Sequence, residues 1–282
     1  MEPHHFFTAQ RILIVAGKGG VGKSTVAGAL ALLAARSGLR TLLVGLDARP
    51  SEVPAHELLE RVTVTPGGAL SDYLSSKGMG LLSRQLARSG IVELVATTAP
   101  GLDDLLVLGR IKAYERELRA DVIIVDGPAA GHAVDLVRAP IQLKRAISGG
   151  PIGQQADEVL DMLADPVRCR IVMVTTPAVT PVTETVETAR DIVDSVRSTL
   201  TPVFVNGVDP SFPPVDPRSL SGGLADAVAY AVARAASQGD AIGLLRESLD
   251  TGVIELPRRR LVGAELVDAV CEDIGLALRA VA

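Results

Sequence analysis

Short, continuous apolar runs alternate along the chain with longer segments in which apolar residues recur every three or four positions. Continuous runs are typical of strands covered on both faces, and the longer periodic segments are typical of covering helices. The order of the two patterns predicts an α/β protein with a mostly parallel β-sheet and helices on both faces. The expected strands are 11–16, 41–46, 122–125, 171–175, 202–205 and 253–256, and the expected helices 23–37, 69–86, 102–118, 219–236 and 263–281.

The chain shows no internal repeat and no clear linker between domains, so we expect one domain over residues 1–282. Residues 1–9 are expected to be a disordered N-terminus. The proline-rich segment 209–217 predicts an exposed, stiff connection, after which the chain folds back onto the sheet.

Composition narrows the class of protein. Of the 282 residues, 48% are hydrophobic and 22% charged, which excludes disorder along the whole chain. A net charge of −5 and 2% aromatic residues argue against a nucleic-acid-binding surface. Cys169 and Cys271 lie far apart with no CxxC pair, which predicts neither zinc nor a disulfide framework and fits a cytoplasmic protein.

A phosphate-binding motif lies between the first expected strand and helix. The segment Gly17-Lys-Gly-Gly-Val-Gly-Lys-Ser24 satisfies G-x-x-x-x-G-K-[ST]. Its glycines let backbone N–H groups converge on phosphate oxygens, and the helix N-terminus adds a favourable dipole. Lys23 should contact the β- and γ-phosphates of ATP or ADP, Ser24 should bind Mg²⁺, and Thr25 should lie near the α-phosphate. The predicted cradle comprises Gly17, Lys18, Gly19, Gly20, Val21, Gly22, Lys23, Ser24 and Thr25.

Two aspartates follow expected strands and should therefore stand at the carboxyl edge of the sheet, beside the phosphate loop. Asp126 follows four apolar residues in the Walker B pattern, and we expect it to hold a Mg²⁺-bound water. Asp47 is a candidate metal ligand and the candidate acceptor that orients the attacking water. A purely structural role, as a turn or helix cap, stays open for both.

The second lysine of the loop, Lys18, carries a family resemblance. The sequence Gly-Lys-Gly-Gly-Val-Gly-Lys-Ser-Thr resembles the deviant Walker A motif of the MinD, ParA, nitrogenase iron protein and arsenite-pump ATPases. In that group the extra lysine reaches across a dimer interface to the nucleotide of the partner. The resemblance implies that Lys18 acts in trans and joins Lys23 and Asp47 as a catalytic residue; a solvated surface lysine is the alternative.

The segment from Asp126 to His132 narrows the resemblance. It is similar to the D-T-A-P-T-G-H switch of the arsenite-pump and tail-anchored-protein-targeting ATPases, with Asp126, Gly131 and His132 matching and residues 127–130 departing. The likeness implies that His132 is a switch residue near the γ-phosphate. Without this likeness, a structural role would be the simpler interpretation of a lone histidine.

Later stretches agree with the same family. Residues 174–177 and 181–185 resemble its strand-to-helix junction. Asn206, which closes a Phe-Val-Asn stretch, matches an adenine-reading asparagine, and Pro257, which closes Glu-Leu-Pro, matches a segment flanking the base. A turn role for Asn206 is the alternative. The resemblance covers essentially the whole chain, is nearest to the actinobacterial branch, and implies a P-loop NTPase with three α/β/α layers.

Three departures limit what the resemblance implies. The zinc-bridging CxxC pair of the eukaryotic members is absent, and so are the cysteines of the arsenite pumps. The interval 133–168, which matches the client-binding helical insertion, is short and contains one methionine. Residues 46–50 replace an S-T-D-P-A switch, so slow hydrolysis is expected.

The leading hypothesis is therefore a cytoplasmic, Mg²⁺-dependent ATPase that dimerises around ATP, as a homodimer or with a paralogue, and switches conformation on hydrolysis. The family implies a client protein, which could be membrane-associated and which the sequence does not identify. One alternative is a partitioning ATPase of the MinD or ParA type, but residues 258–260 form the only basic cluster and the last helix is acidic. The other alternative is a regulatory subunit that binds nucleotide without turnover.

Overall fold

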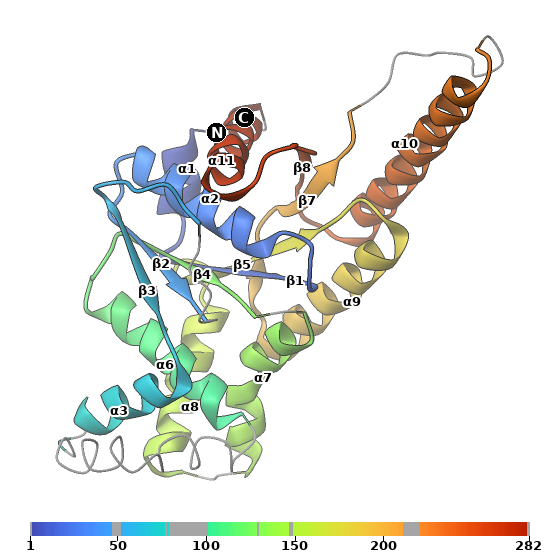
Figure 1. Ribbon diagram of the computed structural model, residues 1–282. Helices are drawn as coiled ribbons and strands as arrows, with labels where there is room; N and C mark the ends of the chain where they lie inside the picture. The colour runs from blue at the N-terminus through green and yellow to red at the C-terminus, as the bar shows by residue number, and fades with distance from the viewer. Residues whose placement is uncertain are drawn as a thin grey trace.

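A parallel sheet forms the centre of the molecule (Figure 1). The computed structural model describes residues 2–46, 52–76, 78, 101–128, 130–146, 149–210 and 220–280. The sheet has the order β3-β2-β4-β1-β5-β7-β8, β6 pairs with β5, and every described pair is parallel, which confirms the predicted α/β class. The strands are β1 (Ile12–Gly17), β2 (Thr41–Gly45), β3 (Leu59–Thr63), β4 (Val122–Asp126), β5 (Cys169–Thr175), β6 (Thr199–Leu200), β7 (Val203–Val208) and β8 (Val253–Pro257).

Helices lie on both sides of this sheet and make three layers (Figure 1). One side holds α1 (Pro3–Thr8), α2 (Lys23–Arg36) and α11 (Gly263–Ala280). The other side holds α3 (Pro66–Ser76), α6 (Leu102–Arg116), α7 (Ala130–Ala146), α8 (Gly150–Ala164), α9 (Val179–Val196) and α10 (Gly223–Ser248).

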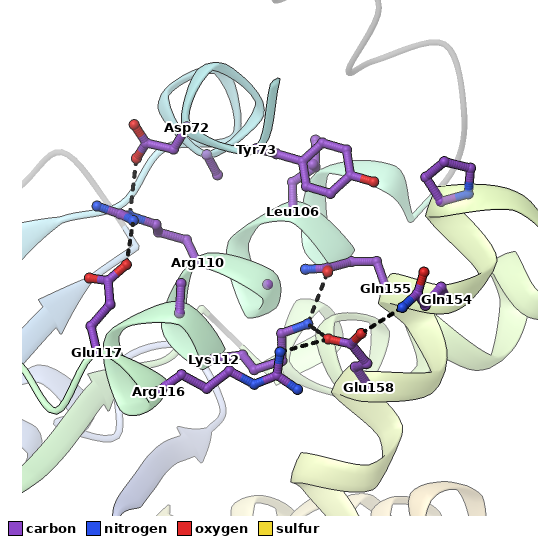
Figure 2. Close-up of a pocket in the computed structure, with 14 residues that line it drawn as sticks. Asp72, Tyr73, Leu106, Arg110, Lys112, Arg116, Glu117, Gln154, Gln155 and Glu158 are labelled. Carbon is purple, nitrogen blue, oxygen red and sulfur yellow. Dashed lines mark hydrogen bonds and ion pairs between the residues drawn. The ribbon is translucent and has the colours of Figure 1, made fainter. Parts of the chain in front are cut away.

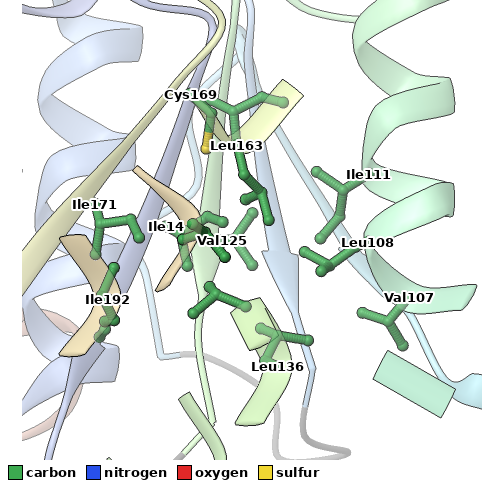
Figure 3. Close-up of a cluster of buried hydrophobic side chains, with 14 of the residues drawn as sticks. Ile14, Val107, Leu108, Ile111, Val125, Leu136, Leu163, Cys169, Ile171 and Ile192 are labelled. Atoms are coloured by element: carbon green, nitrogen blue, oxygen red, sulfur yellow. The ribbon is translucent and has the colours of Figure 1, made fainter. Parts of the chain in front are cut away.

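The two faces of β1 explain why the predicted strands are continuous apolar runs. Ile12 and Ile14 belong to the hydrophobic cluster on the α6 side, and Leu13 and Val15 belong to the cluster on the α2 side. Figure 3 shows Ile14 among buried side chains from the neighbouring strands and from α6, α7 and α9. Because side chains alternate between faces and both faces are covered, no position of such a strand can be polar at low cost.

The expectation that residues 1–9 are disordered is wrong. Pro3–Thr8 forms α1, and the side chains of Phe6 and Phe7 are only 4% and 1% exposed. These rings pack into the cluster formed by α2 and α11. Each buried phenylalanine removes a large apolar area from water, which compensates for ordering a short segment. A helix of six residues is too short to show a periodic pattern in the sequence.

The remaining differences between the predicted and the observed elements are local. The strands at β3 and β6 were not predicted, because β3 is an edge strand with charged residues and β6 has two residues. The predicted helix 219–236 is longer and ends at Ser248. The interval 133–168 is helical, as expected, and its helices α7 and α8 pack on the main core. Residues 211–217 of the proline-rich segment lie outside the described residues.

Among the helices of the described ranges, none is both long and apolar enough to cross a membrane.

Candidate nucleotide-binding site

The predicted phosphate loop connects the end of β1 to the start of α2. Gly20 and Gly22 have φ angles of 81° and 91°, in the left-handed region that favours glycine. A Cβ atom on Gly17 would lie 2.2 Å from the carbonyl oxygen of Val174 in β5, and one on Gly22 would lie 2.2 Å from Nδ2 of Asn206. Gly20 is therefore required by its backbone conformation, and Gly17 and Gly22 by close packing against β5 and β7.

The residues predicted to grip phosphate and metal occupy the first turn of α2. The side chain of Lys23 is buried, and its Nζ donates a hydrogen bond to the carbonyl oxygen of Lys18 at 2.9 Å, across the loop. Ser24 is exposed and Thr25 is half-buried. The first N–H groups of a helix have no partner within the helix, and its dipole favours an anion there. The geometry fits the phosphates of a nucleotide, with the Ser24 hydroxyl available to a divalent metal ion.

Asp126 lies at the same edge of the sheet. In the strand register it pairs with Val15 of β1, two residues before the loop begins, and with Gly45 of β2. A carboxylate is chemically able to hold a metal-bound water, and this role of Asp126 stays a prediction. Asp47, two residues beyond the end of β2, lies outside the described residues. His132 lies in the first turn of α7, and its side chain is also outside the described part.

Gly127 explains one departure from the family switch. Its N–H donates a hydrogen bond to the carbonyl oxygen of Val15 at 3.0 Å, and a Cβ atom at this position would lie 2.4 Å from that oxygen. A threonine, which the family has here, would clash with the backbone of β1 in this arrangement. The glycine lets the chain pass β1 closely as it leaves Asp126.

We therefore expect Gly127→Ala to lower the free energy of unfolding by about 2 kcal/mol, because a backbone carbonyl in a central strand cannot move aside. Urea unfolding followed by circular dichroism measures the change. Gly239→Ala is the matched control: a Cβ there meets no atom within 4 Å, so it should be neutral or slightly stabilising within α10. Equal stability of Gly127→Ala and the unmodified chain would contradict the close packing.

The residues predicted to flank the base lie on the neighbouring strands β7 and β8. The Nδ2 group of Asn206 donates a hydrogen bond to the carbonyl oxygen of Val21 at 2.9 Å, so Asn206 contacts the phosphate loop directly. Pro257 pairs with Val208 in the strand register, beyond an irregularity at Gly207, whose φ is 78°. Asn206 thus lies beside the loop, and Pro257 lies at the carboxyl end of β8. Recognition of the adenine base by Asn206 stays a prediction.

Glu184 is a residue of the site that sequence reasoning missed. The Nζ group of Lys18 forms an ion pair with Oε1 of Glu184 in α9, and the two side chains are 47% and 32% exposed. The other oxygen, Oε2, is buried and accepts no hydrogen bond from the described residues. Glu184 lies within the segment 181–185 that carried part of the family resemblance, but no sequence pattern reveals its contact with Lys18. In this chain, the extra lysine is held on its own subunit.

The cavity between α3, α6 and α8 is separate from the phosphate loop (Figure 2). It has a volume of about 260 Å³ and carries both positive and negative side chains. The buried Nζ of Lys112 lies 2.9 Å from Oε1 of Gln155 and 2.7 Å from Oε2 of Glu158, and Arg116 lies 3.0 Å from the same Glu158 oxygen. Burial lowers the pKa of Lys112, and the hydrogen bond from Lys112 lowers the pKa of Glu158. Glu158 thus pairs with two cations, and the network joins α6 to α8.

Both cysteines are buried free thiols. Burial raises the pKa of Cys169 to about 12 and that of Cys271 to about 11. Thiols this weakly acidic and this well covered react slowly at neutral pH. Within the described ranges, no group of three His, Cys, Asp or Glu residues has the arrangement of a metal site.

Comparisons with known proteins agree with this geometry. Residues 12–277 match the family model of the CobQ/CobB/MinD/ParA nucleotide binding domain. The chain belongs to this family. It is 32% identical over 207 residues to the ATPase BagA of Mycobacterium tuberculosis strain H37Rv, an alignment that covers 64% of this chain and 61% of that protein. The ATPase GET3 of Chaetomium globosum is 26% identical over 159 residues, covering 49% of this chain and 45% of that protein.

A further relative, the ATPase ASNA1 homolog 1 of Paramecium tetraurelia, is 26% identical over 150 residues, which are 48% of this chain and 45% of that protein. The alignment with the mycobacterial relative spans about three-fifths of its length. The family membership confirms the resemblance that the phosphate loop and the segment after Asp126 predicted, together with the P-loop fold.

Proposed function

We propose that this chain is a Mg²⁺-dependent ATPase that dimerises around ATP and uses hydrolysis to change its conformation and its affinity for a partner. The convergence of three elements on one loop supports this function. Lys23 lies within the loop, Asp126 lies at the end of the strand beside it, and Asn206 makes a hydrogen bond to it. Family membership and the names of the relatives point to the same activity.

Each residue has a defined task in this proposal. Lys23 leaves the carbonyl oxygen of Lys18 and neutralises charge on the β- and γ-phosphates. The backbone N–H groups at the start of α2 hold the phosphates in place. Ser24 would hold the magnesium ion directly and Asp126 through a bound water, and the ion when bound would supply positive charge against the phosphate oxygens. Asp47 orients the attacking water.

Lys18 has two positions in the proposed cycle. In the isolated chain it pairs with Glu184, and in the ATP-bound dimer it reaches the nucleotide of the second subunit. An ion pair with this much exposure contributes no more than about 1 kcal/mol. A triphosphate carries more negative charge than one carboxylate, so the release of Lys18 from Glu184 is favourable when a partner presents its nucleotide.

The test measures phosphate release at increasing protein concentration. We expect Lys18→Ala to bind ATP with nearly unchanged affinity and to hydrolyse it about 10³-fold more slowly at saturating protein, as when an arginine finger is removed. Lys144→Ala, a lysine on the exposed face of α7 paired with Asp157, is the matched control and should hydrolyse ATP normally. Normal hydrolysis by Lys18→Ala at every concentration would exclude action in trans, and unchanged turnover of Asp47→Asn would remove the role given to Asp47.

Two other functions remain as alternatives with less support. A partitioning ATPase needs a free basic surface, but Arg258 pairs with Asp209 at 2.6 Å and Arg259 pairs with Asp273. Two of the three arginines of the cluster are therefore engaged by carboxylates. Failure to bind DNA or anionic vesicles with ATP present would exclude that function. A regulatory subunit without turnover is favoured only by the altered switch at 46–50. ATP that stays intact through long incubation with the chain would support it.

A further inference from the structure

The first half of α10 is largely exposed. Within residues 223–237, all of which the structure describes, none is buried. Leu224 is 60% exposed and Tyr230 67%. The second half of the same helix is anchored in the core, where Ala241 and Leu245 are almost fully buried. Figure 1 shows the first half of α10 standing clear of the sheet.

The composition of this projecting half is that of a buried helix. Most of its residues are alanine, valine or leucine, and its charged side chains are Asp226 and Arg234. A helix that is apolar all round is normally covered on more than one side. Leaving it in water costs free energy in proportion to the exposed apolar area. The projecting half, residues 223–237, is therefore expected to be covered by another protein surface.

The projecting half is anchored at the carboxyl edge of the sheet, the edge that also carries the phosphate loop. Asp209, just after β7, accepts hydrogen bonds from Nε2 of Gln238 at 2.7 Å and from Arg234, and its own N–H donates to Oε1 of Gln238 at 3.0 Å. These contacts fix the middle of α10 at the carboxyl edge of the sheet. Residues before Arg234 thus extend beyond the edge at which Asn206 contacts the loop.

We propose that this half of α10 binds a second copy of the chain, as an antiparallel helix pair around a two-fold axis at Tyr230. Asp226, Tyr230 and Arg234 are spaced by four residues and so share one stripe of the helix. Asp226 and Arg234 lie equally far from Tyr230 on either side. An antiparallel pair centred there brings Asp226 against Arg234 of the partner subunit at both ends, as a self-complementary interface requires. Arg234 also pairs with Asp209 of its own chain, and its side chain is 39% exposed, so each Arg234 would lie between two carboxylates. The alanines beside this stripe let the two helices approach closely.

The size of the contact sets its strength. A pair of half-helices buries less than the ~1,600 Å² of a standard stable interface, so by itself it holds the dimer weakly. This inference rests on the proposed function for the rest of the interface area, because the faces around the bound nucleotides would supply the additional contact. We expect ATP to tighten a weak dimer that already exists without nucleotide.

Cysteine cross-linking tests the pairing directly. Tyr230→Cys introduces an exposed thiol next to the two-fold axis, while Cys169 and Cys271 are buried. Under mild oxidation we expect a disulfide-linked dimer to form about tenfold faster than with Val167→Cys, which is 66% exposed and lies before β5 at the opposite edge of the sheet. Equal rates for the two variants, no cross-link, or a cross-link only to an unrelated partner would overturn the proposal.

A charge exchange tests the orientation. Asp226→Arg alone and Arg234→Asp alone each place like charges against one another across the pair and should weaken the dimer about tenfold in sedimentation equilibrium. Arg234→Asp also loses the ion pair with Asp209 of its own chain, so Asp209→Asn, which removes that charge contact and leaves Arg234 in place, is the control and should dimerise like the wild type. Mixing the two variants restores both opposite-charge contacts and should recover the wild-type affinity as a heterodimer. A mixture no tighter than its components would exclude the antiparallel pair.

The two proposals fail separately. If the Tyr230→Cys variant cross-links but the wild-type chain shows no heat with ATP and Mg²⁺ in calorimetry, the ATPase function is excluded and the helix pair stands. If the wild-type chain binds ATP but the Tyr230→Glu variant dimerises as tightly as the wild type, the helix pair is excluded and the ATPase function stands.

Discussion

Replacing Lys23 with alanine is expected to slow ATP hydrolysis by about 10²–10³-fold, the effect of removing one charged donor from a developing negative charge. Lys23 is buried at the start of α2, and its ammonium already lies inside the loop, 2.9 Å from the carbonyl oxygen of Lys18. No other lysine of the motif can replace it, because Lys18 points away to Glu184. The measurement is phosphate release at saturating ATP.

Calorimetry and thermal unfolding complete this test. ATP binding stabilises a folded chain according to its affinity, so ATP should raise the melting temperature of the wild type more than that of Lys23→Ala. Without ATP the two should melt at similar temperatures if the loop keeps its conformation. Lys144→Ala again serves as the control, since it is an exposed lysine outside the site. Equal turnover and equal ATP-induced stabilisation of Lys23→Ala and wild type would contradict the site.

Replacing Glu158 with glutamine is expected to lower the free energy of unfolding at pH 7 by about 3 kcal/mol, because it leaves the charge of Lys112 buried without its partner. The side chain of Lys112 is only 5% exposed, and Glu158 is its one carboxylate contact among the described ion pairs. Gln155 still accepts a hydrogen bond from Lys112, but it carries no charge. Urea unfolding measures the loss.

The same contact has a defined pH dependence. The hydrogen bond from Lys112 lowers the pKa of Glu158 below its ordinary 4.5. A carboxyl whose pKa is lower in the folded chain stabilises it above pH 4.5 and loses this contribution as the pH falls through the lowered value. The stability difference between wild type and Glu158→Gln should therefore shrink below about pH 4.5.

Arg116→Ala is the matched control for the Glu158 prediction. It removes the other cation that contacts the same Glu158 oxygen, but Arg116 is 56% exposed, so the cost should be below about 1 kcal/mol. Equal losses for Glu158→Gln and Arg116→Ala, or a difference that persists unchanged at low pH, would contradict the role of the buried pair.

The sequence by itself determined the fold class, the central strands and the phosphate loop. These features depend on local patterns: apolar runs that need cover on both faces, and glycines followed by Lys23 and Ser24 at a helix start. The carboxyl ends of parallel strands meet at one edge of a sheet, and for this reason the sequence alone predicts that Asp126 lies beside that loop. Asn206 was found through family resemblance, and its contact with Val21 through the structure.

The tertiary structure decided the features that depend on residues far apart in the chain. The burial of Phe6 and Phe7, the pairing of Lys18 with Glu184, and the closeness of Gly127 to Val15 are contacts that no local pattern encodes. The projecting half of α10 is the clearest case: its composition predicts a buried helix, and only the packing of the neighbouring elements leaves it exposed. Local sequence sets which conformation a segment prefers, whereas the partners of a side chain follow from how the elements pack.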